Sequence, residues 1–272
     1  MTTRCGAVEL DASLPADLCA LLQSRYADRA QALPAAQHGS GSAAGPQFRL
    51  VQAREGLQLV ALAAPELGVL HIDLLRGSAG WRSGARARGE RLVRACGVLR
   101  RSAGPPRIVD GTGGLGTDSW LLASAGATVV TCEQHPVLAA LLGDAVQRAA
   151  ADAADVAARI RVLHGDVRRH IGCLDADVLY LDPMYPPRRK AALGDRRLRL
   201  LAALLGAEGM VADDAAGLVE TGLAGGVARL VLKRPKHAQI GVARTPSHSL
   251  EGRSTRFDVW ISAPASPPRH SS

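Results

Sequence analysis

The 272-residue sequence lacks any apolar run that approaches the roughly 18 to 20 residues of a membrane-spanning helix. Its first residues also lack the basic-then-apolar pattern of a secretory signal. Hydrophobic residues make up 47% of the chain, which is enough to bury a full core. We therefore expect a globular protein without a membrane partner, located in the cytoplasm.

Paired cysteines and clustered histidines are also lacking. The five cysteines are scattered, and no Cys-x-x-Cys pair is available to bind zinc or to form a redox centre. The eight histidines show no metal-ligand spacing. We therefore predict buried or inert thiols and no metal site.

Acidic residues are scarce in two segments. Residues 82–107 carry eight arginines against Glu90 alone, and residues 188–199 carry six cations against Asp195 alone. The formal net charge of +8 is therefore concentrated in these segments. They form either a solvated helix face or a surface for nucleic-acid phosphates, and the second reading is favoured because one segment begins three residues after Tyr185. The candidate RNA-binding residues here are Arg82, Arg86, Arg88, Arg188, Arg189 and Lys190.

The first part of the chain has the pattern of a small α+β lobe over residues 1–80. We expect a strand at 4–10, a helix at 14–33, a flexible loop at 34–47, and strands at 48–53, 57–63 and 69–75. Residues 81–106 form an arginine-rich connecting segment with a helix. The main domain spans 107–263, and 264–272 form a disordered tail.

From Arg107 onward, apolar runs alternate with helical segments. This alternation predicts a doubly wound, Rossmann-like α/β fold with a parallel sheet. A helix is expected at 135–149, where Pro136 occupies the first turn. The expected strands are 107–111, 127–133, 160–164, 177–182, 229–233 and 255–262.

The first of these strands ends in a glycine-rich turn that opens a helix. Asp110 is followed by Gly111, Gly113 and Gly116, a spacing that also fits a dinucleotide fingerprint. Taken alone, the match is equally consistent with an ordinary tight turn. No Gly-Lys-Ser/Thr follows, so the turn is not the phosphate-binding loop of NTPases.

The next two strands each end in a carboxylate. Glu133 is either a helix-start residue before Pro136 or the acceptor for the hydroxyls of an adenosine ribose. Asp166 can cap the following helix, contact the adenine amino group, or do both.

The fourth strand leads into Asp182, Pro183 and Tyr185, which combine a carboxylate, a rigid turn and an aromatic ring. Pro183 prevents regular sheet pairing, so Asp182 should lie at the strand end, where open parallel sheets bind ligands. These three residues are the candidate catalytic group, suited to holding a flat, amino-bearing base. Lys233 and Arg234 end a later strand, either as a solvent-exposed exit or as contacts to an RNA backbone.

Asp182-Pro183-Met184-Tyr185 resembles the Asn/Asp-Pro-Pro-Tyr/Phe motif of Class I S-adenosylmethionine-dependent amino methyltransferases, with Met184 in place of the second proline. With Val109 to Leu142, Leu230 to Pro235 and Arg256-Phe257-Asp258, the chain is similar to the RsmJ family of bacterial 16S rRNA guanine-N2 methyltransferases over residues 68–262. The resemblance implies S-adenosylmethionine as cofactor. It carries cofactor contacts over to Thr117, Asp118, Glu133, Gln134, Asp166, Val167 and Asp182, beside Asp110 and the three glycines.

The expected function is therefore methyl transfer to the exocyclic N2 of a guanosine, with 16S rRNA or the small ribosomal subunit as partner. Asp182 and the Pro183 carbonyl would accept hydrogen bonds from N2, and Tyr185 would stack on the base. Adenine-N6 or protein-glutamine methylation, an NAD-dependent oxidoreductase and a non-catalytic RNA-binding protein are the alternatives. The oligomeric state is open, with a monomer assumed.

Overall fold

The computed structural model of the chain describes residues 3–32, 47–76, 80, 84–100, 104–185, 196–210 and 214–262. These residues form two compact units. The first comprises residues 1–73, 135–148 and 185–212, and the second comprises 74–134, 149–184 and 213–272. The first unit therefore contains more of the chain than the N-terminal lobe that was delimited from the sequence, since it also includes two later segments. The expected loop at 34–47 and the tail at 264–272 lie almost entirely outside the described residues.

The first unit is built on a five-stranded sheet with the order β1-β2-β3-β4-β5. Its strands pair antiparallel except for β2 and β3, which are parallel. The expected single strand at 4–10 is wrong, because Gly6, with φ of 58°, reverses the chain into a hairpin. The strands are β1 (Thr3–Cys5), β2 (Val8–Leu10), β3 (Phe48–Ala53), β4 (Gly56–Ala61) and β5 (Val69–Leu70).

Three helices complete this unit: α1 (Ala16–Ala32), α5 (Pro136–Ala149) and α8 (Arg196–Ala207). A buried polar cluster joins α1 to the end of α8 and the start of α5. Glu208, directly after α8, accepts a hydrogen bond from the Tyr26 hydroxyl of α1 at 2.9 Å and lies 3.2 Å from the His135 imidazole, which precedes α5. The carboxylate thus links three segments that are far apart in the sequence.

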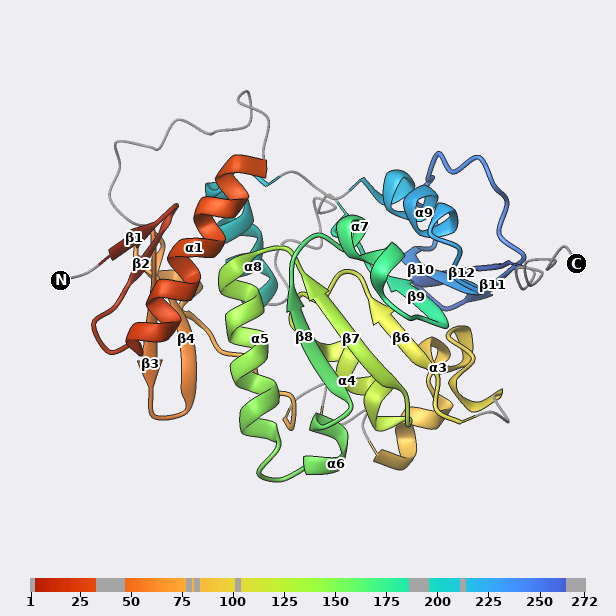
Figure 1. Ribbon diagram of the computed structural model, residues 1–272, viewed down its shortest axis with the longest axis horizontal. Helices are drawn as coiled ribbons and strands as arrows, with labels where there is room; N and C mark the ends of the chain where they lie inside the picture. Colours follow the sequence, from red (N-terminus) through yellow and green to blue (C-terminus); the bar gives the residue numbers. More distant parts are fainter. Residues whose placement is uncertain are drawn as a thin grey trace, which may run out of the picture. The chain divides into compact units, whose positions relative to one another are not determined.

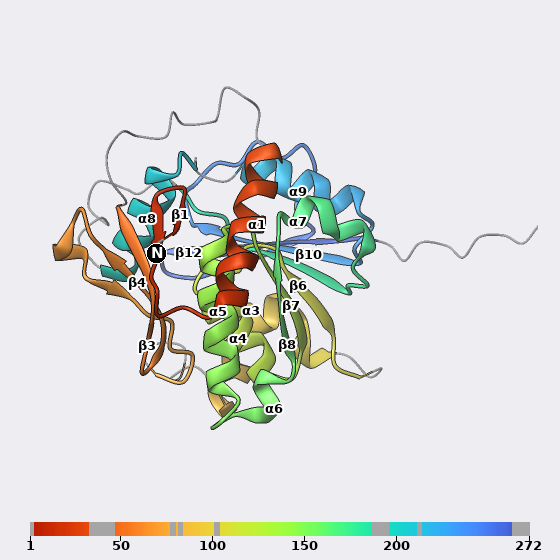
Figure 2. The same ribbon diagram turned by 60° about the vertical axis from the view of Figure 1, so that its left-hand side comes forward.

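The second unit contains a seven-stranded sheet with the order β11-β12-β10-β9-β6-β7-β8. The five strands from β10 to β8 are parallel, and β12 and β11 add antiparallel. Figure 2 shows β6, β7 and β8 side by side. Five of the six expected strands are confirmed as parallel, whereas the strand expected at 255–262 is β12, which pairs antiparallel with β10, and β11 was not expected. The bounds are β6 (Arg107–Asp110), β7 (Thr128–Glu133), β8 (Ile160–His164), β9 (Val178–Leu181), β10 (Arg229–Pro235), β11 (His248–Glu251) and β12 (Thr255–Ile261).

Alternating side chains of the strands pack into two separate cores, because successive residues of a strand face opposite sides of the sheet. On one face, Val178 and Tyr180 of β9 pack with residues of α3 (Arg91–Ala95) and α4 (Thr117–Ser124). On the other face, Leu179 and Leu181 pack with residues of α7 (Val167–His170) and α9 (Ala215–Ala224). Helices therefore cover both faces of this sheet, as expected for a doubly wound fold (Figure 1).

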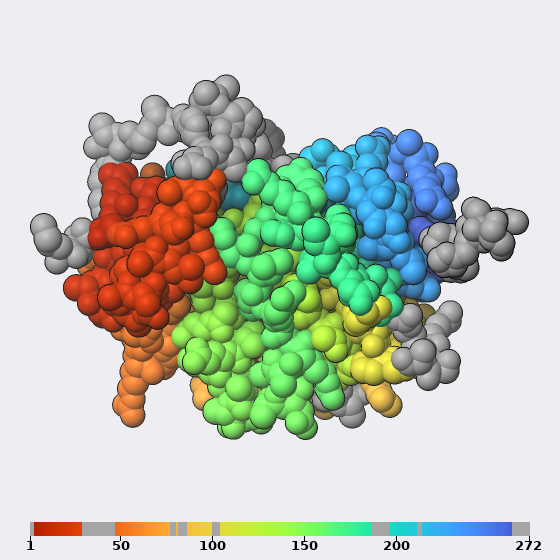
Figure 3. All heavy atoms as spheres, viewed as in Figure 1, coloured from red at the N-terminus to blue at the C-terminus, as the bar shows by residue number. Residues whose placement is uncertain are grey.

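The helices α7 and α9 lie against one another on their face of the sheet, and the green and blue atoms of this region adjoin in Figure 3. The short helix α6 (Ala154–Ala157) precedes β8. Trp120 of α4 is only 1% exposed and lies in the core. Among the residues described, no helix has the length and apolar character needed to cross a membrane.

Candidate active site

The candidate site lies in the second unit, where the parallel strands end. Asp110 is the last residue of β6 and pairs in register with Thr131 of β7 and Tyr180 of β9. Glu133 is the last residue of β7, and Asp182 directly follows β9. Because β6 has β7 on one side and β9 on the other, the chain reverses its direction of progress across the sheet here. Such a switch point is where open α/β sheets bind ligands.

The glycine turn between β6 and α4 is fixed by its own backbone. The amide of Gly111 donates to the Tyr180 carbonyl at 2.9 Å, and that of Gly113 donates to the Cys132 carbonyl at 2.8 Å. The Gly114 amide donates to Glu133 Oε2 at 2.7 Å. Gly116 has φ of 73° and begins α4, a conformation that favours glycine. The turn is therefore tied to both neighbouring strands.

Two of these glycines leave no room for a side chain. A Cβ on Gly113 would lie 2.7 Å from the Thr131 methyl carbon and 3.1 Å from the Cys132 carbonyl oxygen. A Cβ on Gly111 would lie 2.8 Å from a Leu181 methyl carbon. The turn consequently presents bare backbone at the strand ends, as required where a ligand approaches the main chain.

Gly113→Ala is expected to destabilise the protein by about 1 to 3 kcal/mol, because the added methyl group must displace packed atoms and the backbone of β7. Urea denaturation measures the loss. Gly143→Ala is the matched control: that glycine lies within α5 with no atom near its would-be Cβ, so alanine should stabilise the helix by about 0.5 to 1 kcal/mol. Equal effects of the two substitutions would contradict the close packing described here.

Asp110 is buried at 1% exposure and accepts hydrogen bonds from two polar neighbours. Its Oδ1 accepts from the Thr112 amide at 3.1 Å, and its Oδ2 accepts from the Ser119 hydroxyl at 2.5 Å. Thr131 donates in turn to the Ser119 oxygen at 2.7 Å. Burial raises the pKa of Asp110 to about 7, although these hydrogen bonds oppose the shift.

Asp110 should make the stability of the protein pH-dependent. When folding raises the pKa of a carboxyl, the folded state binds more protons than the unfolded state at pH values between the two pKa values, so stability falls as pH rises. Between pH 4 and about pH 7, the stability of the wild type relative to Asp110→Asn should fall by up to roughly 1.4 kcal/mol per pH unit, then level off. Urea denaturation at several pH values measures this difference. A flat difference would contradict the raised pKa.

A lysine bridges two carboxylates beside this turn. Lys233 Nζ of β10 donates to Asp118 Oδ2 of α4 and to Asp182 Oδ2, both at 2.7 Å. The Tyr180 hydroxyl donates to the same Asp118 oxygen at 2.6 Å. We refer to Tyr180, Asp118, Lys233 and Asp182 as the lysine cluster. Its members come from β9, α4, β10 and the segment after β9.

Burial and neighbouring charges determine the protonation states of the side chains in the lysine cluster. Burial alone would lower the pKa of Lys233, but the two carboxylates outweigh it and raise the pKa, so the ammonium stays charged. Burial, then Asp118, raises the pKa of Tyr180, which therefore remains a hydrogen-bond donor. Burial raises the pKa of Asp182 and Asp118 adds to the shift, whereas Lys233 lowers it. The charged lysine is thus the group that favours the ionised form of Asp182.

Asp182 is also held by its backbone, because its amide donates to the Thr112 hydroxyl at 2.7 Å. Its side chain is 34% exposed and can still be reached by a ligand. Pro183 is buried, and Met184 is 37% exposed. The boundary between the compact units falls after Met184, so Tyr185 belongs to the first unit and its stacking on a base stays a prediction.

Asp166 is the N-cap of α7, and its side chain accepts from the Arg168 amide at 3.0 Å. The capping alternative is therefore confirmed, and adenine contact stays a prediction. Burial alone would raise the pKa of Asp166, but the hydrogen bonds from Arg168 outweigh it and lower the pKa. Val167 is buried at 3% exposure, and Gln134 directly follows β7. Thr117, the first residue of α4, is half-buried.

The expected RNA-binding residues divide into three groups. Arg82, Arg188, Arg189 and Lys190 lie outside the described residues. Arg86 and Arg88 are exposed on a 3₁₀ helix (Gly84–Gly89). Lys233 and Arg234 point into the protein instead of forming a solvent-exposed strand exit, since Lys233 belongs to the lysine cluster and Arg234 Nε donates to Asp258 at 2.5 Å. Their contact with RNA stays a prediction.

The charge of the site suits a cationic cofactor. Within the part of the chain that the structure describes, no group of three or more His, Cys, Asp or Glu side chains could hold a metal ion. The sulfonium of S-adenosylmethionine is positive, whereas NAD carries an anionic pyrophosphate. The carboxylates at this edge of the sheet are Asp110, Asp118, Glu133, Asp166 and Asp182.

The bare glycine turn and this excess of carboxylates therefore fit S-adenosylmethionine better than a dinucleotide.

Comparison with known proteins decides the family. The model of the family described as "Putative SAM-dependent methyltransferase" matches residues 36–262. Ribosomal RNA small subunit methyltransferase J of Thioalkalivibrio sulfidiphilus is 40% identical over 244 residues, covering 86% of this chain and 93% of that protein. The chain belongs to the ribosomal RNA small subunit methyltransferase J family.

Other relatives agree with the methyltransferase J assignment. The methyltransferase J of Pseudomonas aeruginosa PAO1 is 37% identical and covers 91% of this chain and 92% of that protein. Among solved structures, a SAM-dependent methyltransferase from Neisseria gonorrhoeae superposes with a TM-score of 0.62 at 26% identity, covering 97% of this chain and 99% of that one. The Class I methyltransferase fold and the use of S-adenosylmethionine are thereby confirmed.

Proposed function

We propose that this enzyme transfers a methyl group from S-adenosylmethionine to the exocyclic N2 of a guanosine in 16S rRNA. The observation that carries the proposal is the placement of Asp182. Its carboxylate is exposed enough to meet a base and is held by Lys233, its backbone amide is held by the Thr112 hydroxyl, and the residue lies beside the glycine turn. The names of the relatives support the substrate.

Guanine N2 is a weak nucleophile because its lone pair is delocalised into the ring. Asp182 Oδ and the Pro183 carbonyl accept hydrogen bonds from the two N2 hydrogens, which favours localisation of the lone pair on nitrogen. N2 then forms a bond to the methyl carbon as the carbon–sulfur bond breaks, and one N2 proton leaves toward the Asp182 carboxylate and solvent. Alignment of the two reactants supplies on the order of 7 to 11 kcal/mol of barrier reduction.

Lys233 is a positioning residue in this mechanism. Its ammonium holds one oxygen of Asp182 at 2.7 Å, which favours the ionised form of the carboxylate and restricts its orientation. Asp118 also accepts from the ammonium, and the Tyr180 hydroxyl donates to the same Asp118 oxygen. The base reaches Asp182 only when it is flipped out of the RNA structure, and Tyr185 stacks on it there.

The cofactor supplies an activated methyl group on a sulfonium. Glu133, at the end of β7, would accept hydrogen bonds from the ribose hydroxyls, and Asp166 would accept from the adenine amino group. The glycine turn from Gly111 to Gly116 and the start of α4, with Thr117 and Asp118, line the methionine part. Gln134 and Val167 complete the contacts implied by the family.

A labelled-methyl assay tests the proposal. Purified enzyme is incubated with radiolabelled S-adenosylmethionine and either a 16S rRNA transcript or purified small subunits, and the RNA is digested to nucleosides. We expect N2-methylguanosine in one of the two substrates. Label in N6-methyladenosine, or in protein only, would overturn the choice of guanine, and no transfer to either substrate would overturn the proposal as a whole.

A further inference from the structure

The connection between β10 and β11 is basic and has no regular secondary structure. It spans residues 236–247, which we call the β10–β11 loop. From Lys233 through Leu250 the sequence contains four Lys or Arg residues and two histidines but no Asp or Glu. At about 12 residues, the loop is well above the median connection length of roughly 4 to 6 residues, and binding residues often lie on long loops.

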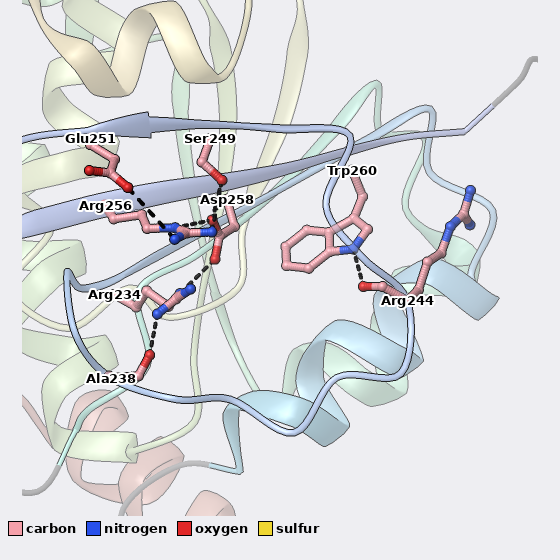
Figure 4. A network of polar contacts seen from close by, with 8 residues as sticks. All are labelled: Arg234, Ala238, Arg244, Ser249, Glu251, Arg256, Asp258 and Trp260. Carbon is pink, nitrogen blue, oxygen red and sulfur yellow. Dashed lines mark hydrogen bonds and ion pairs between the residues drawn. The ribbon is translucent and has the colours of Figure 1, made fainter.

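Buried side chains fix the backbone of this loop at two points (Figure 4). Near its start, Arg234 Nη1 donates to the Ala238 carbonyl while Arg234 Nε donates to Asp258 at 2.5 Å. Near its end, Trp260 Nε1 donates to the Arg244 carbonyl at 2.8 Å. Asp258 and Trp260 are each only 3% exposed. The loop is therefore shaped by the sheet beneath it.

Asp258 lies at the centre of the hydrogen-bond network that fixes the loop. It accepts hydrogen bonds from Arg234, Ser249 and Arg256, each at 2.5 Å. Burial alone would raise the pKa of Asp258, but these hydrogen bonds outweigh it and lower the pKa. The carboxylate is consequently ionised, and both of its oxygens accept hydrogen bonds from groups below the loop.

The exposed side of the loop and the start of β11 carry one arginine and two histidines. His237, Arg244 and His248 are exposed, and Figure 4 shows the Arg244 guanidinium pointing away from the network. Exposed Arg253 lies in the turn between β11 and β12, and this turn adjoins the loop because the Lys236 amide donates to the Ser254 carbonyl at 2.9 Å. Nearby, Glu251 pairs with Lys236 at 3.0 Å and with Arg256 at 3.7 Å.

We propose that the β10–β11 loop, together with Arg253, is a second RNA-binding surface that contacts phosphates of the RNA strand leading away from the nucleotide being methylated. The inference rests on the proposed function. The loop starts beside the candidate site, since Lys233, three residues before it, is bonded to Asp182. It then runs back along the sheet, because the Arg244 carbonyl accepts from Trp260, which pairs with Leu230 near the start of β10. Exposed arginines with no acidic residue in the loop match a phosphate backbone, and a preformed loop loses less entropy when it binds.

The test is the double variant Arg244→Ala with Arg253→Ala, which leaves the Arg244 carbonyl and its bond to Trp260 in place. Binding to a 16S rRNA transcript is measured at several salt concentrations. Each lost phosphate contact should lower the slope of log affinity against log salt by about 0.7 to 0.9, so the double variant should lose about 1.4 to 1.8. Affinity at low salt should fall on the order of tenfold, while the affinity for S-adenosylhomocysteine and the thermal midpoint stay unchanged.

Arg161→Ala is the matched control, because Arg161 is exposed on β8, the opposite edge strand of the same sheet. It should leave the salt dependence unchanged. An unchanged salt slope in the double variant, or an equal loss in the control, would overturn the inference. Either result would leave the proposed function intact if the wild-type enzyme still makes N2-methylguanosine, whereas a wild type that methylates no RNA refutes the proposed function itself.

Discussion

Asp182→Ala is expected to lower kcat for methyl transfer by on the order of 10²- to 10⁴-fold, the range lost when a positioned acid–base group is removed. The substitution removes the acceptor for the N2 hydrogens and leaves Lys233 bonded to Asp118 alone. Affinity for RNA should change little, since the phosphate contacts lie elsewhere. Single-turnover methylation of saturating 16S rRNA measures the effect, with RNA binding measured in parallel.

Two further variants sharpen this prediction. Asp182→Asn keeps one acceptor oxygen but loses the charge, so its rate should lie between those of the wild type and the alanine variant. Glu220→Ala removes an exposed carboxylate on α9 in the same unit and should leave the rate unchanged. Full activity of the Asp182→Ala variant would rule out the proposed mechanism.

The placement of Asp182 could be predicted from the sequence because each step depends on neighbouring residues. An apolar run followed by Pro183 marks a buried strand and its end, and β9 ends at Leu181 as this pattern indicates. The same holds for Asp110, whose glycine turn requires the conformations found at Gly114 and Gly116. Parallel strands then bring these ends to one edge of the sheet.

The lysine cluster could not be predicted in this way, because its contacts join residues far apart in the chain. Lys233 is 51 residues from Asp182 and 115 from Asp118. From its sequence neighbours alone, Lys233 resembles any basic residue at a strand exit, and only the register of β10 beside β9 brings it to the carboxylates. The role of the Tyr180 hydroxyl could not be predicted either, because Tyr180 lies within an apolar run.

The strand β11 was missed for a related reason. His-Ser-Leu-Glu has neither apolar alternation nor a β-branched residue, and its pairing with β12 supplies the order. Ser249 of β11 donates to Asp258 of β12 at 2.5 Å, which adds a side-chain link to the backbone ladder. The sequence of an edge strand that is stabilised by such cross-strand contacts gives only a weak signal of its secondary structure.

Lys233→Met should distinguish the positioning role of this lysine from the RNA contact that its place in the sequence suggests. The variant keeps a long apolar stem but leaves Asp118 and Asp182 facing each other without the cation between them. We expect kcat to fall on the order of 10²-fold, comparable to the loss of other acid–base contributions. The KM for RNA and its salt dependence should stay close to the wild-type values, because no phosphate contact is removed.

The pH profile provides the decisive measurement. Since Lys233 lowers the pKa of Asp182 and Asp118 raises it, removing the lysine must raise that pKa further. Ionised Asp182 is the active form, so the acidic limb of kcat should move to higher pH in Lys233→Met, and raising the pH should restore part of the lost rate. Lys233→Arg retains the charge and should show a smaller displacement. If Lys233 instead acted on RNA phosphates, the salt slope and the KM for RNA would change while the pH profile stayed in place.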